Sequence, residues 1–358
     1  MQISYQTINL PKRFPLAISR GVHAASDNLF MWLSLNDTTG VGEMSPGKTE
    51  GANTAEAAQQ SLDAFLQKNL DIFEHAKPQR EFVTSVYDLA RAQNVPACAL
   101  AALDIALWDW LGKSNQQSVR QLLALELPTV PTSVTIGINP PEVVKERVPL
   151  LLDGTGVKSL KIKLGSPEGI AADKAMYQQV VESTAPYNVQ LRVDANGGWS
   201  VSEAEEMMVW IAERGADYIE QPLKEGDEEG LVTLFPNRAL PVYIDESCRF
   251  AEDVTKWSDR IDGVNMKLMK CGGITEALRI IEQANNNNLK TMMGCMGESS
   301  VSIAAAAQIT GLIDHIDLDS HLNLAPDPAT GAEIQHGIII PNNLPGHGAQ
   351  VKSEFIEG

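Results

Sequence analysis

A repeating alternation of β-rich and helical segments, from about residue 126 onward, constrains the fold of this chain more than any other feature. Short β-rich runs lie between residues 133 and 319, namely SVTIGI, SLKIKL, VQLRVD, DYIEQ, PVYIDE, GVNMKL, LKTMMGC and HIDLD. Segments of helical pattern separate them, among them 168–185, 200–214, 273–286 and 299–310. Strands that alternate with helices form parallel βαβ units. Eight such units close into a (β/α)₈ barrel, so we expect an α/β protein.

The segments on either side of the repeat have other patterns. Residues 2–10 and 29–36 have strand character, and the polar segment SRGVHAASDN is interpreted as the loop that joins them. Three helical stretches follow, which begin near Asn53, near Lys77 and at Pro96. These features predict an α+β block. The end of the chain is rich in glycine and proline (GIIIPNNLPGHG) and is expected to return to that block.

Composition excludes several classes of function. The formal net charge of −18 gives no sign of the positive groove that nucleic acids need. No apolar run approaches the roughly 20 residues of a membrane span, and no signal peptide is evident. The four cysteines are scattered without a CxxC pair, which favours buried thiols in a reducing compartment. We therefore expect a soluble cytoplasmic protein.

Acidic residues recur at the ends of three successive predicted strands. In a (β/α)₈ barrel the active site lies where the strands end. The third, fourth and fifth strands end in Asp194, Glu220 and Asp245, at near-equal intervals along the chain. Three converging carboxylates repel one another unless a cation neutralises them, and hard oxygen ligands suit Mg²⁺. The alternative is that each acid caps the next helix or pairs with a surface base.

Lysines occupy the strands on both sides of these acids. Lys161 and Lys163 share one face of the second strand, because side chains alternate along a strand. Lys267 lies on the sixth strand. A carboxylate bound to Mg²⁺ loses its α-proton more easily, because the metal stabilises the enediolate that forms. Lys163 and Lys267 could then remove and return a proton from opposite faces. Lys161 is expected to lower the pKa of its neighbour and to stabilise the enediolate. The alternative is an amphipathic edge strand with a solvated face.

Five motifs carry a family resemblance: KIK at 161–163, DAN at 194–196, EQP at 220–222, DES at 245–247 and KLMKCGG at 267–273. With them, the sequence resembles the enolase superfamily, in its muconate-lactonizing-enzyme subgroup, over essentially the whole chain. The resemblance implies a modified (β/α)₇β TIM-type barrel (126–325) and an α+β N-terminal capping domain (1–125), completed by a C-terminal tail (326–358). It implies Mg²⁺ on Asp194, Glu220 and Asp245, with Lys163 and Lys267 as acid/base catalysts. Homo-oligomers are common in this family.

The last predicted strand narrows the reaction within the subgroup. The segment DLD resembles the D-x-D motif of dipeptide epimerases, in which the two acids, here Asp317 and Asp319, bind the free ammonium of the substrate. The resemblance then implies a Mg²⁺-dependent isomerase that inverts the α-carbon of the C-terminal residue of a dipeptide such as L-Ala-L/D-Glu. Alternatively, the two acids cap the barrel or form salt bridges to the capping domain. The competing functions are those of an N-acylamino-acid racemase, an o-succinylbenzoate synthase, a cycloisomerase or a catalytically silent barrel.

Three further residues are candidates for substrate contact. Arg20, in the loop between the first two strands, could pair with a substrate carboxylate, which would suit Ala-Glu. Alternatively, it is a surface arginine or a tether for the loop. Met296 and Glu298, in GCMGESS, are placed at the site by the family resemblance, and Glu298 would otherwise only open the following helix. His321 follows the D-x-D motif by two residues and could also face the site, although a single histidine is more often structural.

Overall fold

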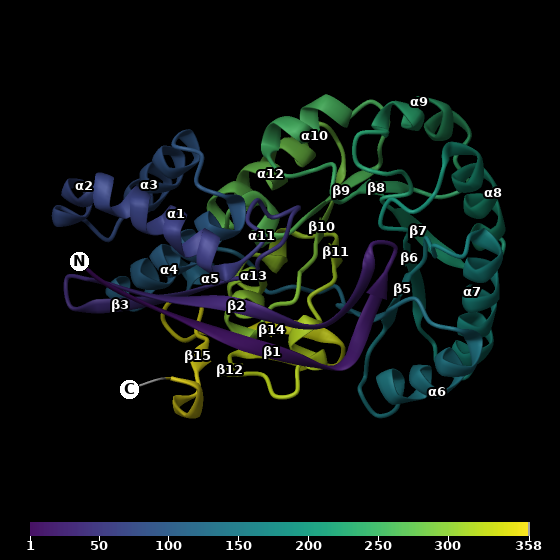
Figure 1. Cartoon of the computed structure of the whole chain (residues 1–358), viewed down its shortest axis with the longest axis horizontal. Coiled ribbons are helices and arrows are strands. Elements are labelled where there is room, and N and C mark those ends of the chain that lie inside the picture. Colours follow the sequence, from purple (N-terminus) through teal and green to yellow (C-terminus); the bar gives the residue numbers. More distant parts are fainter. Residues whose placement is uncertain (357–358) are drawn as a thin grey trace.

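The computed structural model describes residues 1–356, so the last two residues of the predicted tail lie outside the described residues. Its centre is a barrel of eight parallel strands in sequence order (Figure 1). The strands are β4 (Ser133–Ile136), β5 (Ser159–Lys163), β6 (Gln190–Asp194), β7 (Ala216–Glu220), β8 (Val242–Ile244), β9 (Gly263–Met266), β10 (Lys290–Met293) and β11 (His315–Ile316). A parallel bridge between Thr132 and Ile316 joins the last strand to the first. The predicted barrel is confirmed.

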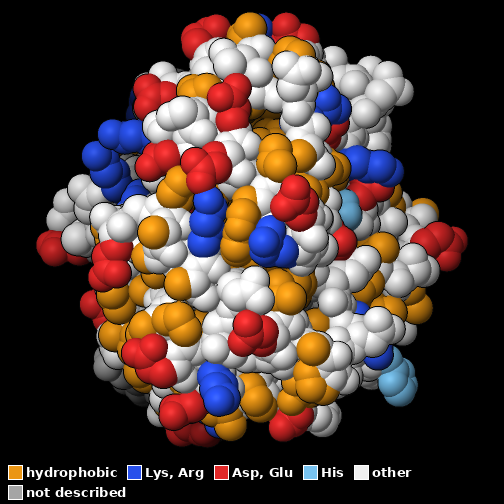
Figure 2. All heavy atoms as spheres, turned by 90° about the vertical axis from the view of Figure 1, so that its right-hand side faces the viewer, with side chains coloured by type: hydrophobic (Ala, Val, Ile, Leu, Met, Phe, Trp, Pro, Cys, Tyr) orange, Lys and Arg blue, Asp and Glu red, His pale blue; other side chains and the backbone are white. Residues whose placement is uncertain are grey.

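Helices connect the strands and cover the outside of the barrel (Figure 1). They are α6 (Pro141–Leu152), α7 (Ile170–Thr184), α8 (Val201–Ala212), α9 (Leu231–Leu234), α10 (Ala251–Trp257), α11 (Leu268–Cys271), α12 (Ile274–Asn286) and α13 (Ser300–Ala307). Local sequence sets their starts: Ser200 and Glu203 form a capping box at α8, which satisfies two backbone amides that the helix leaves free. Figure 2 shows the barrel side that carries α7 and α8, where acidic side chains are scattered among apolar and basic ones.

The N-terminal block packs a three-stranded antiparallel sheet on a bundle of helices. The strands are β1 (Gln2–Ile18), β2 (Gly21–Leu35) and β3 (Thr38–Met44), and the helices are α1 (Ala55–Lys68), α2 (Leu70–Glu74), α3 (Arg80–Ala92), α4 (Ala97–Asn115) and α5 (Val119–Leu122). Helix α4 lies directly on β3. A Cβ atom at Gly42 would lie 1.9 Å from the carbonyl oxygen of Ala102, so only glycine allows this approach.

The first two strands are longer than the sequence predicted. Ser19 and Arg20 alone separate β1 from β2, so the polar segment interpreted as a loop is largely strand. Ala17 pairs with Val22, and Leu16 with His23. The prediction was wrong because backbone pairing holds the far half of this hairpin, and its side chains are mostly exposed and need no apolar pattern. The hairpin crosses the barrel mouth, where Ser19 Oγ donates to the carbonyl of Asn196 at 2.8 Å (Figure 1).

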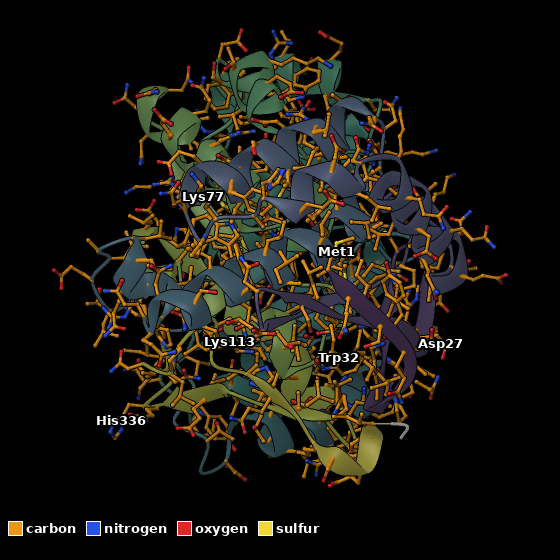
Figure 3. All side chains as sticks on the ribbon, turned by 90° about the vertical axis from the view of Figure 1, so that its left-hand side faces the viewer. Met1, Asp27, Trp32, Lys77, Lys113 and His336 are labelled. Atoms are coloured by element: carbon orange, nitrogen blue, oxygen red, sulfur yellow. The ribbon has the colours of Figure 1, made fainter. Side chains whose placement is uncertain are left out.

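The tail forms the short strands β12 (Ala329–Thr330), β13 (Ala332–Gln335), β14 (Ile338–Pro341) and β15 (Gln350–Val351). Ala329 of β12 belongs to one buried apolar cluster with Ile8 and Phe30 of the N-terminal block. The backbone amide of His347 donates to Asp109 Oδ1 at 3.0 Å, and its ring contacts the carbonyl of Val41 at 2.8 Å. Figure 3 shows the tail strands below the helices, with Lys113 near the end of α4 and His336 at the β13–β14 turn. The domain boundaries at 125/126 and 325/326 stay predictions.

One buried acid joins the N-terminal block to the barrel. Glu43 on β3 accepts hydrogen bonds from Asn28 Nδ2 (2.8 Å), from the backbone amide and hydroxyl of Ser299 (2.8 and 2.7 Å) and from the Ser302 amide (3.1 Å). These last donors belong to the start of α13, where a carboxylate is favoured. Cys98, Cys248 and Cys271 are buried and Cys295 is half-buried. In residues 1–356, no helix is long and apolar enough to cross a membrane.

Candidate active site at the barrel mouth

Three buried carboxylates converge where β6, β7 and β8 end. Asp194 and Glu220 are the last residues of neighbouring strands and lie in register, and Asp245 follows β8 directly. Each offers an oxygen within 4.8 Å of the others, and the three are fully buried. The near-equal spacing of the three acids in the sequence therefore places them at a common height at the mouth of the barrel.

Two lysines lie on opposite sides of this triad. Lys163 Nζ, on β5, is 2.6 Å from Asp194 Oδ2, and Lys267 Nζ, just after β9, is 2.6 Å from Asp245 Oδ2. Asn265 Nδ2 donates to Glu220 Oε1 at 2.8 Å. Strands β6, β7 and β8 lie between the two lysine-bearing strands. The two ammonium groups therefore flank the acids in the way that the sequence predicted.

The charge state of the triad suits a hard divalent cation. Burial and the neighbouring charge of Asp194 raise the pKa of Glu220 to about 8. Burial also opposes ionisation of Asp194, but Lys163 and Lys161 outweigh it and lower the pKa of Asp194 to about 2. The lysines therefore compensate the charge of Asp194, whereas the charge of Glu220 is not fully compensated by the protein. Three carboxylate oxygens within reach of one point are the donors that Mg²⁺ prefers, so the residues fit this metal.

Mg²⁺ should bind the wild-type chain at this triad, and Glu220→Gln should weaken it. Losing a residue that only supports a metal ligand lowers metal affinity by roughly 10–100-fold. Removing the charge of a ligand itself should lower the Mg²⁺ affinity by more than that. Titration calorimetry with MgCl₂ measures both affinities. The matched control is Glu205→Gln, an exposed acid on α8. Equal Mg²⁺ affinity in the wild type and in Glu220→Gln would contradict the assignment.

Lys161 connects the triad to the last strand. Its ammonium is buried and lies 2.8 Å from Glu220 Oε2, 2.5 Å from Asp317 Oδ2 and 3.5 Å from Asp194 Oδ2. Burial would lower the pKa of Lys161, but these three carboxylates raise it well above its usual value. Lys161 is thus a permanent cation in the barrel. The charge of Lys161 is balanced by these three carboxylates.

Asp317 and Asp319 lie just beyond the last strand and not on it. Strand β11 ends at Ile316, because the barrel pairing stops there. Asp317 turns into the barrel toward Lys161, and its Oδ1 is buried without a hydrogen bond from residues 1–356. Asp319 Oδ2 accepts from the Thr135 amide at 2.6 Å. Burial and then the charge of Asp317 raise the pKa of Asp319 to about 7. The two acids are therefore close enough to repel.

Arg20 is held by protein groups at the tip of the hairpin. Its guanidinium lies 2.7 Å from Glu246 Oε1 and donates to the Asn196 carbonyl at 3.1 Å. This geometry supports the interpretation of Arg20 as a tether for the hairpin over the barrel. A cavity of about 470 Å³ lies beneath the tip, and Arg20, Lys48, Asn196 and Glu246 are among its lining residues.

Met296 and Glu298 lie in the segment that follows β10. Glu298 is buried, and its Oε1 accepts from the Met296 amide at 2.7 Å. Burial, and the nearby charge of Glu43, raise the pKa of Glu298 to about 8, while Lys267 opposes this shift. Glu298 thus lies near a candidate catalytic lysine and also shapes its own loop. His321 is buried toward Asp327 of the tail, and burial lowers its pKa to about 4.

Two residues that position the triad, Lys270 and Asn265, were not predicted from the sequence. Lys270 Nζ lies 2.5 Å from Asp245 Oδ1 and donates to the carbonyls of Cys248 and Asn265, both at 3.0 Å. Asn265 itself contacts Glu220. The signal was present in NMKLMKCGG, where a second lysine and an asparagine accompany Lys267. Their partners come from two other strands, which only the closed barrel brings near.

Comparisons with known proteins agree with this architecture. The description "Mandelate racemase / muconate lactonizing enzyme, N-terminal domain" matches residues 3–124, and "Enolase C-terminal domain-like" matches residues 144–355. The chain therefore belongs to the enolase superfamily, in its mandelate racemase and muconate lactonizing enzyme family.

Particular relatives are similar over nearly their full length. A "Hydrophobic dipeptide epimerase" of Flavobacteria bacterium (strain MS024-2A) is 60% identical over 99% of both chains. A protein of the same name from Roseobacter litoralis is 55% identical over 97% of this chain and 98% of its own. Among solved structures, the dipeptide epimerase from Enterococcus faecalis V583, complexed with Mg and L-Leu-L-Tyr, has a TM-score of 0.86 at 28% identity, and the match covers 97% of this chain and 98% of that one.

Proposed function

We propose that this protein is a Mg²⁺-dependent dipeptide epimerase, which inverts the α-carbon of the C-terminal residue of dipeptides with apolar side chains. It is an isomerase, since relatives at 60% and 55% identity over nearly the whole chain are named dipeptide epimerases. The apolar preference is the finer part of the proposal. It is supported by the names of these relatives and by Arg20, which is already paired with Glu246.

The acid pair at the end of the barrel is the observation that carries the proposal. Burial, and then the charge of Asp317, raise the pKa of Asp319 to about 7, and Asp317 Oδ1 has no hydrogen bond from residues 1–356. A second cation beside Lys161 would relieve this repulsion. The free ammonium of a dipeptide supplies that cation, whereas an N-acylated amino acid, muconate or succinylbenzoate does not.

The remaining roles follow from the positions of the lysines. Bound Mg²⁺ on Asp194, Glu220 and Asp245 would offset the charge that the substrate carboxylate gains when its α-proton leaves. Lys163 and Lys267 lie on opposite sides of that position, so one removes the proton and the other delivers one to the opposite face. Lys161, a buried permanent cation, adds further stabilisation to the enediolate. Asp317 and Asp319 fix the amino end of the substrate.

Proton NMR in D₂O tests the reaction directly. The enzyme with Mg²⁺ should replace the α-proton of the C-terminal residue by deuterium in L,L-dipeptides such as L-Leu-L-Tyr, L-Ala-L-Tyr and L-Ala-L-Glu. Resonances of the second diastereomer should grow at the same time. A chelator should stop both changes, and the apolar dipeptides should react faster than L-Ala-L-Glu. Failure of every dipeptide to exchange, with Mg²⁺ shown to be bound, would contradict the proposal and favour acylated or cyclic acids.

Two expectations from the sequence complete the proposal. We expect a cytoplasmic location, which suits an enzyme of small-molecule metabolism. We also expect a homo-oligomer, because homo-oligomers are common in the family. Both stay predictions.

A further inference from the structure

A second cavity lies at the seam where the barrel closes. Its volume is about 350 Å³. It lies among the kinked part of β1, the first barrel strand, helix α6, the turn after β11 and strand β13. Its lining includes Leu16, Val134, Leu151, Val157, Leu322 and Ile334. We call this cavity the seam pocket. It is distinct from the cavity under the hairpin tip, which shares none of these residues.

One acid of the D-x-D pair lines the seam pocket. Asp319 belongs to its wall, as does Thr135, whose amide donates to Asp319 Oδ2 at 2.6 Å. Asp317, two residues earlier, contacts Lys161 inside the barrel at 2.5 Å. The acid pair therefore stands between the interior of the barrel and the seam pocket. Because Asp319 belongs to the wall, a group bound by both acids would adjoin this pocket.

The walls of the seam pocket are apolar, and some are unusually exposed. Leu150 on α6 and Leu322 after β11 are 57% and 48% exposed, although both line the cavity. Apolar surface of this kind gains roughly 25 cal/mol per Å² when a ligand covers it. The pocket is larger than a single side chain of leucine or tyrosine needs, so it can accept a bulky apolar group.

Two arginines add a charge preference. The guanidinium carbons of Arg13 and Arg147 lie 5.1 and 4.6 Å from the centre of the Phe14 ring, and the three residues belong to the pocket lining. Within residues 1–356, neither arginine has a carboxylate within ion-pair distance. Two uncompensated cations on the wall disfavour a cationic side chain in the pocket.

We propose that the seam pocket binds the side chain of the N-terminal residue of the dipeptide and selects a bulky apolar side chain over a cationic one. The inference rests on the proposed function, because the ammonium on Asp317 and Asp319 places the N-terminal α-carbon beside the pocket. The ammonium and the side chain leave the same carbon atom, so the side chain needs a space adjoining the acid pair. The seam pocket is such a space, and its apolar walls suit leucine, methionine or phenylalanine.

Kinetics with paired substrates tests the pocket. Leu150→Trp and Leu322→Trp enlarge exposed side chains at its rim from two separate elements, so the fold should tolerate both. We expect each to lower the ratio of kcat/KM for L-Leu-L-Tyr over L-Ala-L-Tyr by about tenfold or more, the usual effect of crowding an apolar pocket. Leu344→Trp, at a residue that is 52% exposed in the tail and outside the pocket lining, is the matched control and should leave this ratio unchanged.

The charge preference gives an independent readout. Arg147→Glu, and the double variant with Arg13→Glu, should raise kcat/KM for L-Lys-L-Tyr relative to L-Leu-L-Tyr by about tenfold. Ratios that stay the same in all the rim and arginine variants, with wild-type enzyme active on L-Ala-L-Tyr, would overturn the pocket and leave the epimerase intact. Wild-type enzyme inactive on every dipeptide would instead overturn the proposed function. A crystal structure with L-Leu-L-Tyr bound and its leucine outside the seam pocket would also refute the inference.

Discussion

Lys163→Ala and Lys267→Ala should each abolish epimerisation, with a loss of about 10²–10⁴-fold or more in the rate of inversion. The two lysines lie on opposite sides of the acid triad, each 2.6 Å from a carboxylate of that triad. Inversion needs a proton removed from one face and a proton returned to the other. With one lysine missing, the remaining lysine can still exchange a proton on one face of the α-carbon, but it cannot complete the inversion.

The two variants should therefore differ in a way that general damage to the site would not produce. In D₂O, each variant should retain exchange of the α-proton in one diastereomer, without inversion, and lose exchange in the other. The retained diastereomer should be opposite in Lys163→Ala and Lys267→Ala. NMR of L-Leu-L-Tyr and L-Leu-D-Tyr measures all four rates. Lys145→Ala, at an exposed lysine on α6, is the control. Inversion at the wild-type rate in either variant would disprove the two-base mechanism.

The barrel and its acid triad could be predicted from sequence because each depends on a local, periodic signal. Buried parallel strands have runs of apolar residues, and the helices between them have a different period. Asp194, Glu220 and Asp245 recur once per strand–helix unit, and a barrel converts that spacing into a common height. The positions of the lysines followed from the same strand order, because Lys163 ends the strand on one side of the triad and Lys267 directly follows the strand on the other side.

Features that depend on contacts between distant segments could not be predicted. The hairpin of β1 and β2 continues through a polar segment because backbone pairing, and the bond from Ser19 to Asn196, hold it in place. The pairing of Arg20 with Glu246 joins segments that are remote in the sequence. Likewise, the DLD segment alternates like a strand, but the barrel ladder ends at Ile316, so Asp317 and Asp319 have different partners.

Asp319→Asn should lower kcat/KM for dipeptides by roughly 30-fold or more, because removing one partner of a buried charge pair costs about 2–5 kcal/mol. Asparagine keeps an oxygen that can accept from the Thr135 amide, so the local backbone should stay in place. The same change at Asp317 is expected to cost more, since it also removes a carboxylate 2.5 Å from Lys161. Steady-state kinetics on L-Leu-L-Tyr measures both losses.

The role of the acid pair is tested by comparing a dipeptide that has a free ammonium group with one that lacks it. If Asp319 acts on that group, the wild type should discriminate strongly between L-Leu-L-Tyr and its N-acetylated form, and Asp319→Asn should reduce the discrimination. Asp327→Asn is the control, because this acid holds the start of α13 through Ser300, away from the proposed ammonium site. A double Asp317→Asn, Asp319→Asn variant with undiminished activity on free dipeptides would contradict the ammonium role. Preference of the wild type for the acetylated substrate would instead make the protein an N-acylamino-acid racemase, with the same lysines and triad acting on a substrate that has no cation to offer the acid pair.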